Sequence, residues 1–389
     1  MSTRQFWLAV VLLWLSGAAL RLTILAVPPV IPLLRADLHL SATGVGLLSG
    51  LPVALFALAA IPGSLLIARL GSRAALIGGL FVVAIGAALR GGDWGIGPLY
   101  LSTIIMGAGV AVMQPAMPVI ARDWLPARIG FATAIYSNGL LVGEFLPVWT
   151  AEPVVLPLVG GNWRLELAIW AVPVLIIALL VLLLGPATPG RAAKIAGSSA
   201  WWPDWSDKLI WRIGILLGSV SAMYFATNAF LPAYLTSLGR GDLVHDALTA
   251  LNVGQYPASL AMIPIAHRLE RRAWPYLVAG IVMTVSVVGL VFMVGPWTIV
   301  WAGLLGCAGA ATLILGFTLP PLLSEHRDVG RNSAAMFTLS YAIAMAVALI
   351  CGAIWDATGV PAWAFAPILF CTLSLCVTAI LLKANRQLR

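Results

Sequence analysis

Two charged side chains interrupt segments that are otherwise apolar. Arg21 lies near the middle of the apolar run 6–34, and Glu144 lies within a second run, 129–151. The bilayer interior penalises a guanidinium by about 2.5–3.5 kcal/mol, so Arg21 should face the protein interior or water and have a partner. Such a guanidinium can bind the electron-rich part of a solute. A nearby carboxyl can balance its charge or carry a proton.

The two charges are expected at similar depths. Each lies about sixteen residues from the same end of its segment, and each residue adds about 1.5 Å of helix. Arg21 and Glu144 could therefore meet directly or share a solute. Glu144 could act as a proton carrier, or the two residues could form a static interhelical pair. Just before Glu144, Gly139 and Gly143 form a small-xxx-small motif, which indicates close helix packing.

Neutral polar side chains also fall in mid-segment, where they could contact a solute or form hydrogen bonds between helices. These candidate binding residues are Gln114, Tyr136, Asn138, Tyr224, Asn228, Asn252, Gln255 and Tyr341. An arginine facing neutral donors suits a small anion or a small polar, planar solute better than a cation.

Composition places these residues in a membrane. Hydrophobic residues make up 61% of the 389 residues and charged residues only 9%, whereas a soluble globular chain has about 25% charged residues. No polar stretch is long enough for a separate soluble domain. The net charge of +8 does not indicate nucleic-acid binding, because the arginines and lysines lie mostly on one side of the predicted helices, as membrane topology requires.

The chain divides at turns and charges into twelve apolar segments, each predicted to be a transmembrane helix because strand alternation is absent. Their limits are 6–34, 41–67, 74–90, 98–121, 129–151, 163–185, 209–237, 244–266, 274–294, 297–323, 333–356 and 361–382. With cytoplasmic termini, seventeen arginines and lysines fall on the cytoplasmic side, and four fall on the outer side: Arg35, Arg90, Arg164 and Arg240. This bias follows the positive-inside rule.

The segments form two related halves. The sequence predicts an N-terminal six-helix bundle over 1–185, a cytoplasmic linker over 186–207 and a C-terminal six-helix bundle over 208–389. Glycine, proline and arginine patterns in the first half recur about 200 residues later; for example, Pro118 corresponds to Pro320. Six helices per half give parallel repeats.

On these features the sequence resembles the major facilitator superfamily over nearly its whole length. The superfamily signature Gly-x-x-x-Asp-Arg-x-Gly-Arg-Arg/Lys lies after the second helix, and here Arg69, Gly71 and Arg73 match it. Ala68 replaces the signature aspartate and Ser64 the first glycine. The resemblance implies the twelve-helix all-α fold in two pseudo-symmetric bundles, with Arg69, Gly71 and Arg73 as a conformational loop.

Within the superfamily the sequence is similar to the cyanate and 2-nitroimidazole permease branch. The similarity lies in short motifs that include Arg21 with Pro28, Trp124-Leu125-Pro126, and Asn162-Trp163-Arg164. It implies a secondary active transporter that moves a small anionic or polar solute by alternating access, with a proton as the candidate coupling ion.

Other functions remain as alternatives. Efflux of drugs, nitroimidazoles or amino acids would use the same architecture, whereas a receptor or an intramembrane enzyme would need features that this sequence lacks. Gly239-Arg240-Gly241-Asp242 resembles an intramembrane aspartyl protease motif but lies in a turn. We expect no catalytic residue, metal or cofactor, and a monomer in the inner membrane with a small solute and lipid as partners.

Overall fold

The computed structural model describes residues 3–39, 42–186 and 201–383, and within them every regular element is helical. Contacts divide the chain into two units: Met1–Pro203 with Ser324–Ala334, and Asp204–Leu323 with Ala335–Arg389. Most of the predicted linker, 187–200, lies outside the described residues. The predicted domain limits therefore stay a prediction.

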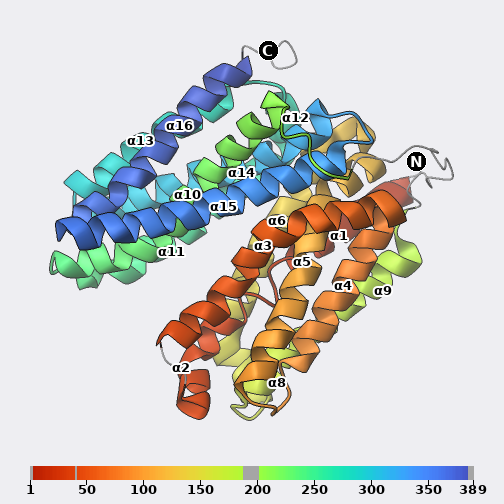
Figure 1. Cartoon of the computed structure of the whole chain (residues 1–389), viewed down its shortest axis with the longest axis horizontal. Helices are drawn as coiled ribbons and strands as arrows, with labels where there is room; N and C mark the ends of the chain where they lie inside the picture. The colour runs from red at the N-terminus through yellow and green to blue at the C-terminus, as the bar shows by residue number, and fades with distance from the viewer. Residues whose placement is uncertain (1–2, 40–41, 187–200, 384–389) are drawn as a thin grey trace. The chain divides into compact units, whose positions relative to one another are not determined.

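The first unit contains the elements drawn from red to yellow-green in Figure 1. They are α1 (Thr3–Ala19), α2 (Val27–Leu38), α3 (Ala42–Leu70), α4 (Ser72–Leu89), α5 (Ile96–Trp124), η1 (Pro126–Arg128), α6 (Ile129–Thr150), η2 (Ala151–Val155), α7 (Leu156–Leu158), α8 (Trp163–Ile169) and α9 (Ala171–Leu184).

The second unit contains the green to blue elements, although the first residues of α15 belong to the first unit by their contacts. They are α10 (Lys208–Ser237), η3 (Gly241–Leu243), α11 (Val244–Val253), α12 (Gln255–Leu269), α13 (Trp274–Phe292), α14 (Trp297–Leu323), α15 (Val329–Thr358), η4 (Pro361–Phe365) and α16 (Ala366–Lys383).

The same packing scheme recurs in both units. In the first, α4 packs on α5 and α9, α3 packs on α5, and α1 packs on α9. In the second, α13 packs on α14 and α16, α11 and α12 pack on α14, and α10 packs on α16. The pairs named here are equivalent under the repeat offset of about 200 residues, as expected for two copies of a six-helix bundle.

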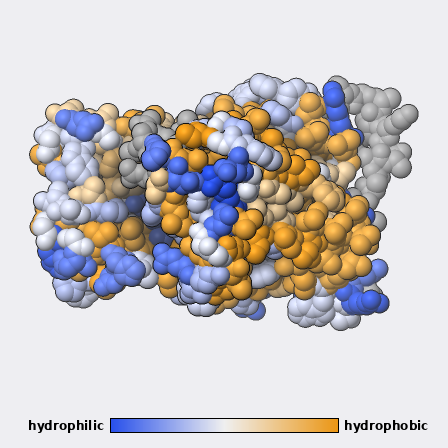
Figure 2. Space-filling view, turned by 90° about the horizontal axis from the view of Figure 1, so that it is seen from below, coloured by the Kyte–Doolittle hydropathy of each residue, from blue (hydrophilic) through white to orange (hydrophobic). Residues whose placement is uncertain are grey.

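Large apolar side chains cover much of the surface, as in the broad hydrophobic areas of Figure 2. Leu183, Phe292, Leu349 and Phe370 each have more than 70% of their surface exposed. In water such exposure would be a liability, but lipid is a favourable surrounding for it. The chain is a multi-pass membrane protein.

Ten helices in the described residues are long and apolar enough to cross a membrane. The first and eighth predicted segments are not among them because each is interrupted. The segment 244–266 is divided at Gly254 into α11 and α12, and Pro257 cannot donate a hydrogen bond to the carbonyl four residues before it.

The first segment is broken more severely, and the expectation of one continuous helix over 6–34 is wrong. Residues 20–26 form turns between α1 and α2. Pro28 and Pro29 lack the N–H groups that an α-helix needs to bond the carbonyls of Ile24 and Leu25. The Val27 N–H bonds the Ile24 carbonyl at 3.4 Å, so the Thr23 carbonyl loses its usual helical donor.

Candidate functional site

Arg21 lies in the break that follows α1, and its guanidinium contacts α6. Arg21 Nε donates to Glu144 Oε1 at 3.1 Å, and the guanidinium carbon lies 5.1 Å from the centre of the Phe56 ring. The Arg21 side chain is 9% exposed, while that of Glu144 keeps 23% exposure. The structure therefore brings together the two charges that the sequence placed at similar depths.

Glycines determine how closely α1 and α6 approach. A Cβ at Gly139 would overlap the Trp14 carbonyl, and one at Gly143 would overlap the Ala18 carbonyl. The small-xxx-small motif is therefore a packing motif, as the sequence indicated. Glu144 follows Gly143 directly, so it lies where α6 comes close to the end of α1.

The other candidates in the first unit are buried polar residues. Asn138 Oδ1 accepts a hydrogen bond from Trp14 Nε1 at 2.9 Å. Gln114 on α5 and Tyr136 on α6 have exposures of 3% and 1%. Sequence reasoning missed Trp14 and Phe56, because an apolar segment gives no sign of which aromatic ring a polar group will meet.

Three of the five candidates in the second unit form one network. Tyr224 donates through its hydroxyl to Asn252 Oδ1 at 2.6 Å, and Asn252 Nδ2 donates to Asn228 Oδ1 at 3.1 Å. Asn228 Nδ2 donates to the Tyr224 carbonyl at 2.9 Å. Gln255 is buried at the start of α12, and Tyr341 stacks on Phe337. These residues can offer neutral donors and acceptors.

The candidate conformational loop joins α3 to α4. Gly71 has φ of 90°, a value that glycine adopts without strain, and Arg69 is exposed. Arg73 Nη2 donates to the Leu182 carbonyl at 2.9 Å, near the end of α9. Next to it, Ser72 Oγ donates to Asp123 Oδ2 at 2.7 Å.

The same end of the first unit includes the segment Ser324–Ala334. Arg122 Nη1 donates to the Ser324 carbonyl at 2.8 Å, and His326 Nε2 lies 3.4 Å from Asp123 Oδ1. The signature aspartate is replaced by Ala68, but Asp123 supplies a carboxylate to this region. Sequence reasoning identified the replacement but not Asp123.

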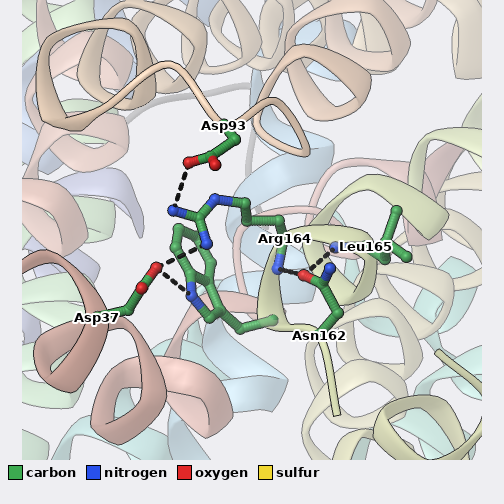
Figure 3. A network of polar contacts seen from close by, with 6 residues as sticks. Asp37, Asp93, Asn162, Arg164 and Leu165 are labelled. Carbon is green, nitrogen blue, oxygen red and sulfur yellow. Dashed lines mark hydrogen bonds and ion pairs between the residues drawn. The ribbon is translucent and has the colours of Figure 1, made fainter. Parts of the chain in front are cut away.

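A polar network that the sequence did not predict connects α2 to α8 (Figure 3). Arg164 lies between two carboxylates, with Nη1 2.6 Å from Asp37 Oδ2 and Nη2 2.8 Å from Asp93 Oδ1. Trp163 Nε1 also donates to Asp37, and the Asn162 side chain caps α8 by accepting from the Arg164 N–H at 2.9 Å. The network ties one end of α2 to the neighbouring helix.

Sequence reasoning also missed Arg90 and Glu166. It counted Arg90 as a charge at an outer end, but Arg90 is only 1% exposed, and Glu166 is 0% exposed. A signal was present, because Glu166 lies inside the predicted segment 163–185, where a carboxyl needs a partner.

Comparison with known proteins decides the family. The family model "Major Facilitator Superfamily" matches residues 13–349. The chain belongs to the major facilitator superfamily. It is a transporter-family protein and not an enzyme.

Relatives in this superfamily match most of the chain. The uncharacterized transporter YycB of Bacillus subtilis is 24% identical over 365 residues, covering 91% of this chain and 88% of the relative. The 2-nitroimidazole transporter of Escherichia coli is 28% identical, with coverages of 88% and 87%. The cyanate transport protein CynX of Escherichia coli is 25% identical, with coverages of 77% and 78%.

Solved structures agree on the fold. The transporter FucP in its outward conformation has a TM-score of 0.76 at 16% identity, with coverages of 97% and 98%. The proton:xylose symporter XylE has a TM-score of 0.74 at 14% identity, with coverages of 99% and 95%. At these identities the likeness carries the fold alone, which is the all-α architecture of two six-helix bundles predicted from the sequence.

Proposed function

We propose that this protein is a secondary active transporter of the cytoplasmic membrane for a small anionic or polar, planar solute. Its two bundles would work by alternating access, with both termini cytoplasmic. The observation that carries the proposal is the Arg21–Glu144 pair at the break in the first membrane span. Interrupted helices are where transporters of several folds hold substrates and ions.

Arg21 is the proposed solute-binding residue. A guanidinium forms strong, charge-assisted hydrogen bonds with anionic or electron-rich acceptors. Cyanate and 2-nitroimidazole, which name two relatives of this chain, are both small and rich in such acceptors. This shared chemistry supports the solute class rather than either solute itself.

Glu144 is the proposed charge partner. While it pairs with Arg21, it offsets part of the cost of a guanidinium in the membrane. A solute that takes over Arg21 would release the carboxylate, which can then accept a proton. This exchange would couple solute movement to a proton, with Glu144 as the carrier.

The neutral residues of both units are proposed to complete the site. Gln114, Tyr136 and Asn138 would contribute from the first unit. In the second unit the contributors would be Tyr224, Asn228, Asn252, Gln255 and Tyr341. Arg69, Gly71 and Arg73 are proposed to act as a conformational loop.

Counterflow in proteoliposomes tests the proposal, with labelled cyanate and 2-nitroimidazole as the first probes. We expect Arg21→Ala to reduce exchange at least about a hundredfold, since a buried hydrogen-bonded charge contributes about 2–5 kcal/mol to binding. Arg21→Lys should keep part of the activity if point charge suffices, and less if the planar fork matters. Full exchange and affinity in Arg21→Ala would contradict this role.

A matched control is available at Arg240, which lies in the turn between α10 and η3. Its Nε and Nη2 each donate to Asp242 at 3.1 Å, and these hydrogen bonds lower the pKa of the Asp242 carboxyl. Arg240→Ala should leave exchange unchanged.

Glu144→Gln tests proton coupling separately. In this variant a pH gradient should no longer drive solute accumulation, and undiminished accumulation would show that Glu144 carries no proton.

A further inference from the structure

Arg90 is a second buried guanidinium, and it contacts the break that carries Arg21. It follows the last residue of α4 and has 1% exposure. Its Nη1 donates to the Thr23 carbonyl at 2.7 Å and lies 3.0 Å from Met106 Sδ. A charged donor on a backbone carbonyl is among the stronger hydrogen bonds in proteins.

The acceptor is a carbonyl that the break has released. Thr23 lies between α1 and α2, and the Val27 N–H that would bond it in a continuous helix bonds Ile24 instead. A carbonyl without a partner in a membrane protein costs several kcal/mol. Arg90 therefore satisfies a backbone group that exists because the first span is interrupted.

Arg90 and Glu166 also have buried atoms without hydrogen bonds. Within the described part of the chain, Arg90 Nε and Nη2 have no hydrogen-bond partner, and neither has Glu166 Oε2. Glu166 Oε1 accepts from Trp170 Nε1 at 3.1 Å. Glu166 lies on α8, which packs on α4 beside Arg90, and no hydrogen bond joins the two side chains in the described part of the chain. Unsatisfied buried donors near an unsatisfied carboxylate oxygen are the setting in which an ordered water bridges two groups.

We propose that Arg90 is a positioning residue for Arg21, with Glu166 as its water-bridged counter-ion. By holding the Thr23 carbonyl, Arg90 fixes the turns at residues 20–26 and so the direction in which the Arg21 side chain leaves the backbone. Arg90 acts on the solute only through this segment. The inference rests on the proposed function for its effect on binding, but its structural part can be tested without any solute.

The structural part predicts how accessible the break is. Leu25 lies in the break and is partly exposed, so Leu25→Cys gives a reporter there. The four natural cysteines all lie in the second unit, and mass spectrometry distinguishes their N-ethylmaleimide adducts from the adduct at position 25. The labelling rate at position 25 then measures how accessible the break is, and the chain without Leu25→Cys gives the background rate.

Two changes remove the Arg90 contact in different ways. Arg90→Lys keeps the charge and a donor. Arg90→Met combined with Glu166→Gln removes both charges together, so that no buried charge is left without its counter-ion and folding is preserved. Arg240→Met is the matched control, because it replaces an exposed arginine outside this region.

We expect the double variant to label at position 25 several times faster than the wild type. It should also bind 2-nitroimidazole about tenfold more weakly, as expected for losing a hydrogen bond from a charged donor. Arg90→Lys should recover part of both effects, and Arg240→Met should change neither. Rescue by the conservative variant is the result that a general loss of stability would not give.

The two readouts separate the inference from the proposed function. An unchanged labelling rate in both Arg90 variants would overturn the inference, whatever happens to transport. Faster labelling with unchanged affinity would show that Arg90 holds the break but does not position a binding residue, and would overturn the inference as well. Loss of binding in Arg21→Ala with unchanged labelling in the Arg90 variants would leave the proposed function standing and remove Arg90 from it.

Discussion

The first span of each unit shows how differently the two copies of the bundle have been used. In the first unit this span is broken over residues 20–26 and carries Arg21, whereas in the second unit α10 is continuous over Lys208–Ser237. The repeat offset of about 200 residues places Tyr224 near the position equivalent to Arg21. One copy has a charge in an interrupted helix, and the other has a neutral hydroxyl in a regular one.

The difference extends to the partners. Arg21 meets Glu144, and Arg90 holds the break, whereas Tyr224, Asn228 and Asn252 satisfy one another through neutral hydrogen bonds. A charge in the membrane requires a counter-ion and a held backbone because its desolvation is costly. A neutral polar group requires only a nearby donor or acceptor. The first unit, with its buried charges, therefore depends on more contacts than the second, with its neutral network. Substitutions in the first unit should have larger effects on stability and transport.

The largest expected effect comes from removing one member of the ion pair. Glu144→Leu leaves Arg21 buried without its counter-ion and should destabilise the protein by about 3–5 kcal/mol. Combining it with Arg21→Met should restore most of the stability, because no charge is then left unpaired. Thermal unfolding of the purified protein in detergent measures both. A single variant as stable as the double variant would show that the pair is not needed for stability.

An intermediate effect is expected at two glycines, one in each unit, where helices pack backbone against backbone. A Cβ at Gly139 would overlap the Trp14 carbonyl, and a Cβ at Gly306 in the second unit would overlap the Leu251 carbonyl. Gly139→Ala and Gly306→Ala should each lower the free energy of unfolding by about 1–3 kcal/mol, because the packed helices must move apart to accommodate the methyl group.

Gly303 is the control for these glycines, since the nearest atom to a Cβ there is the Ala250 carbonyl oxygen at 3.7 Å. Gly303→Ala should be neutral or stabilising, because alanine favours helix by up to about 1 kcal/mol over glycine. The melting temperatures of the three variants decide the matter. Equal losses at Gly139 and Gly303 would mean that close backbone contact is not what the glycines provide.

The smallest expected effect comes from the neutral hydrogen-bond network of the second unit. Tyr224→Phe removes one hydrogen bond to Asn252 and should lower the free energy of unfolding by about 1 kcal/mol. The same loss in solute binding would weaken affinity by less than about tenfold. Counterflow and thermal unfolding of this variant, measured beside Arg21→Ala, test the asymmetry directly. A loss at Tyr224 as large as that at Arg21 would make the two copies equal contributors and remove the basis of the comparison.

The architecture could be predicted from the sequence because hydropathy and repetition are local, additive signals. Twelve apolar segments, the similarity of the halves and the loop at Gly71 indicated the superfamily fold. The same reasoning identified Arg21 and Glu144, since a charge in an apolar run stands out by its cost. It also recognised Gly139 and Gly143 as packing residues.

The contacts that complete the candidate site could not be predicted in the same way. Arg90 is at the end of an apolar segment and looks like a charge at the membrane surface, yet the packing of α4 directs it to the Thr23 carbonyl. Pro28 and Pro29 lie at the start of α2, but a proline can kink a helix as well as interrupt it. The neighbours that satisfy the released groups decide between these outcomes.

Hydropathy and repetition are enough to place the chain in a membrane, to divide it into two related helical halves and to reveal a charge within its first span. The unwinding of this span at residues 20–26, the Arg21–Glu144 pair and the contact of Arg90 with the released carbonyl arise only in the folded chain. The physical reason is one of range. Transfer of each side chain into lipid depends on that side chain and its near neighbours in sequence, whereas satisfying a buried charge or carbonyl depends on groups that folding brings from distant segments.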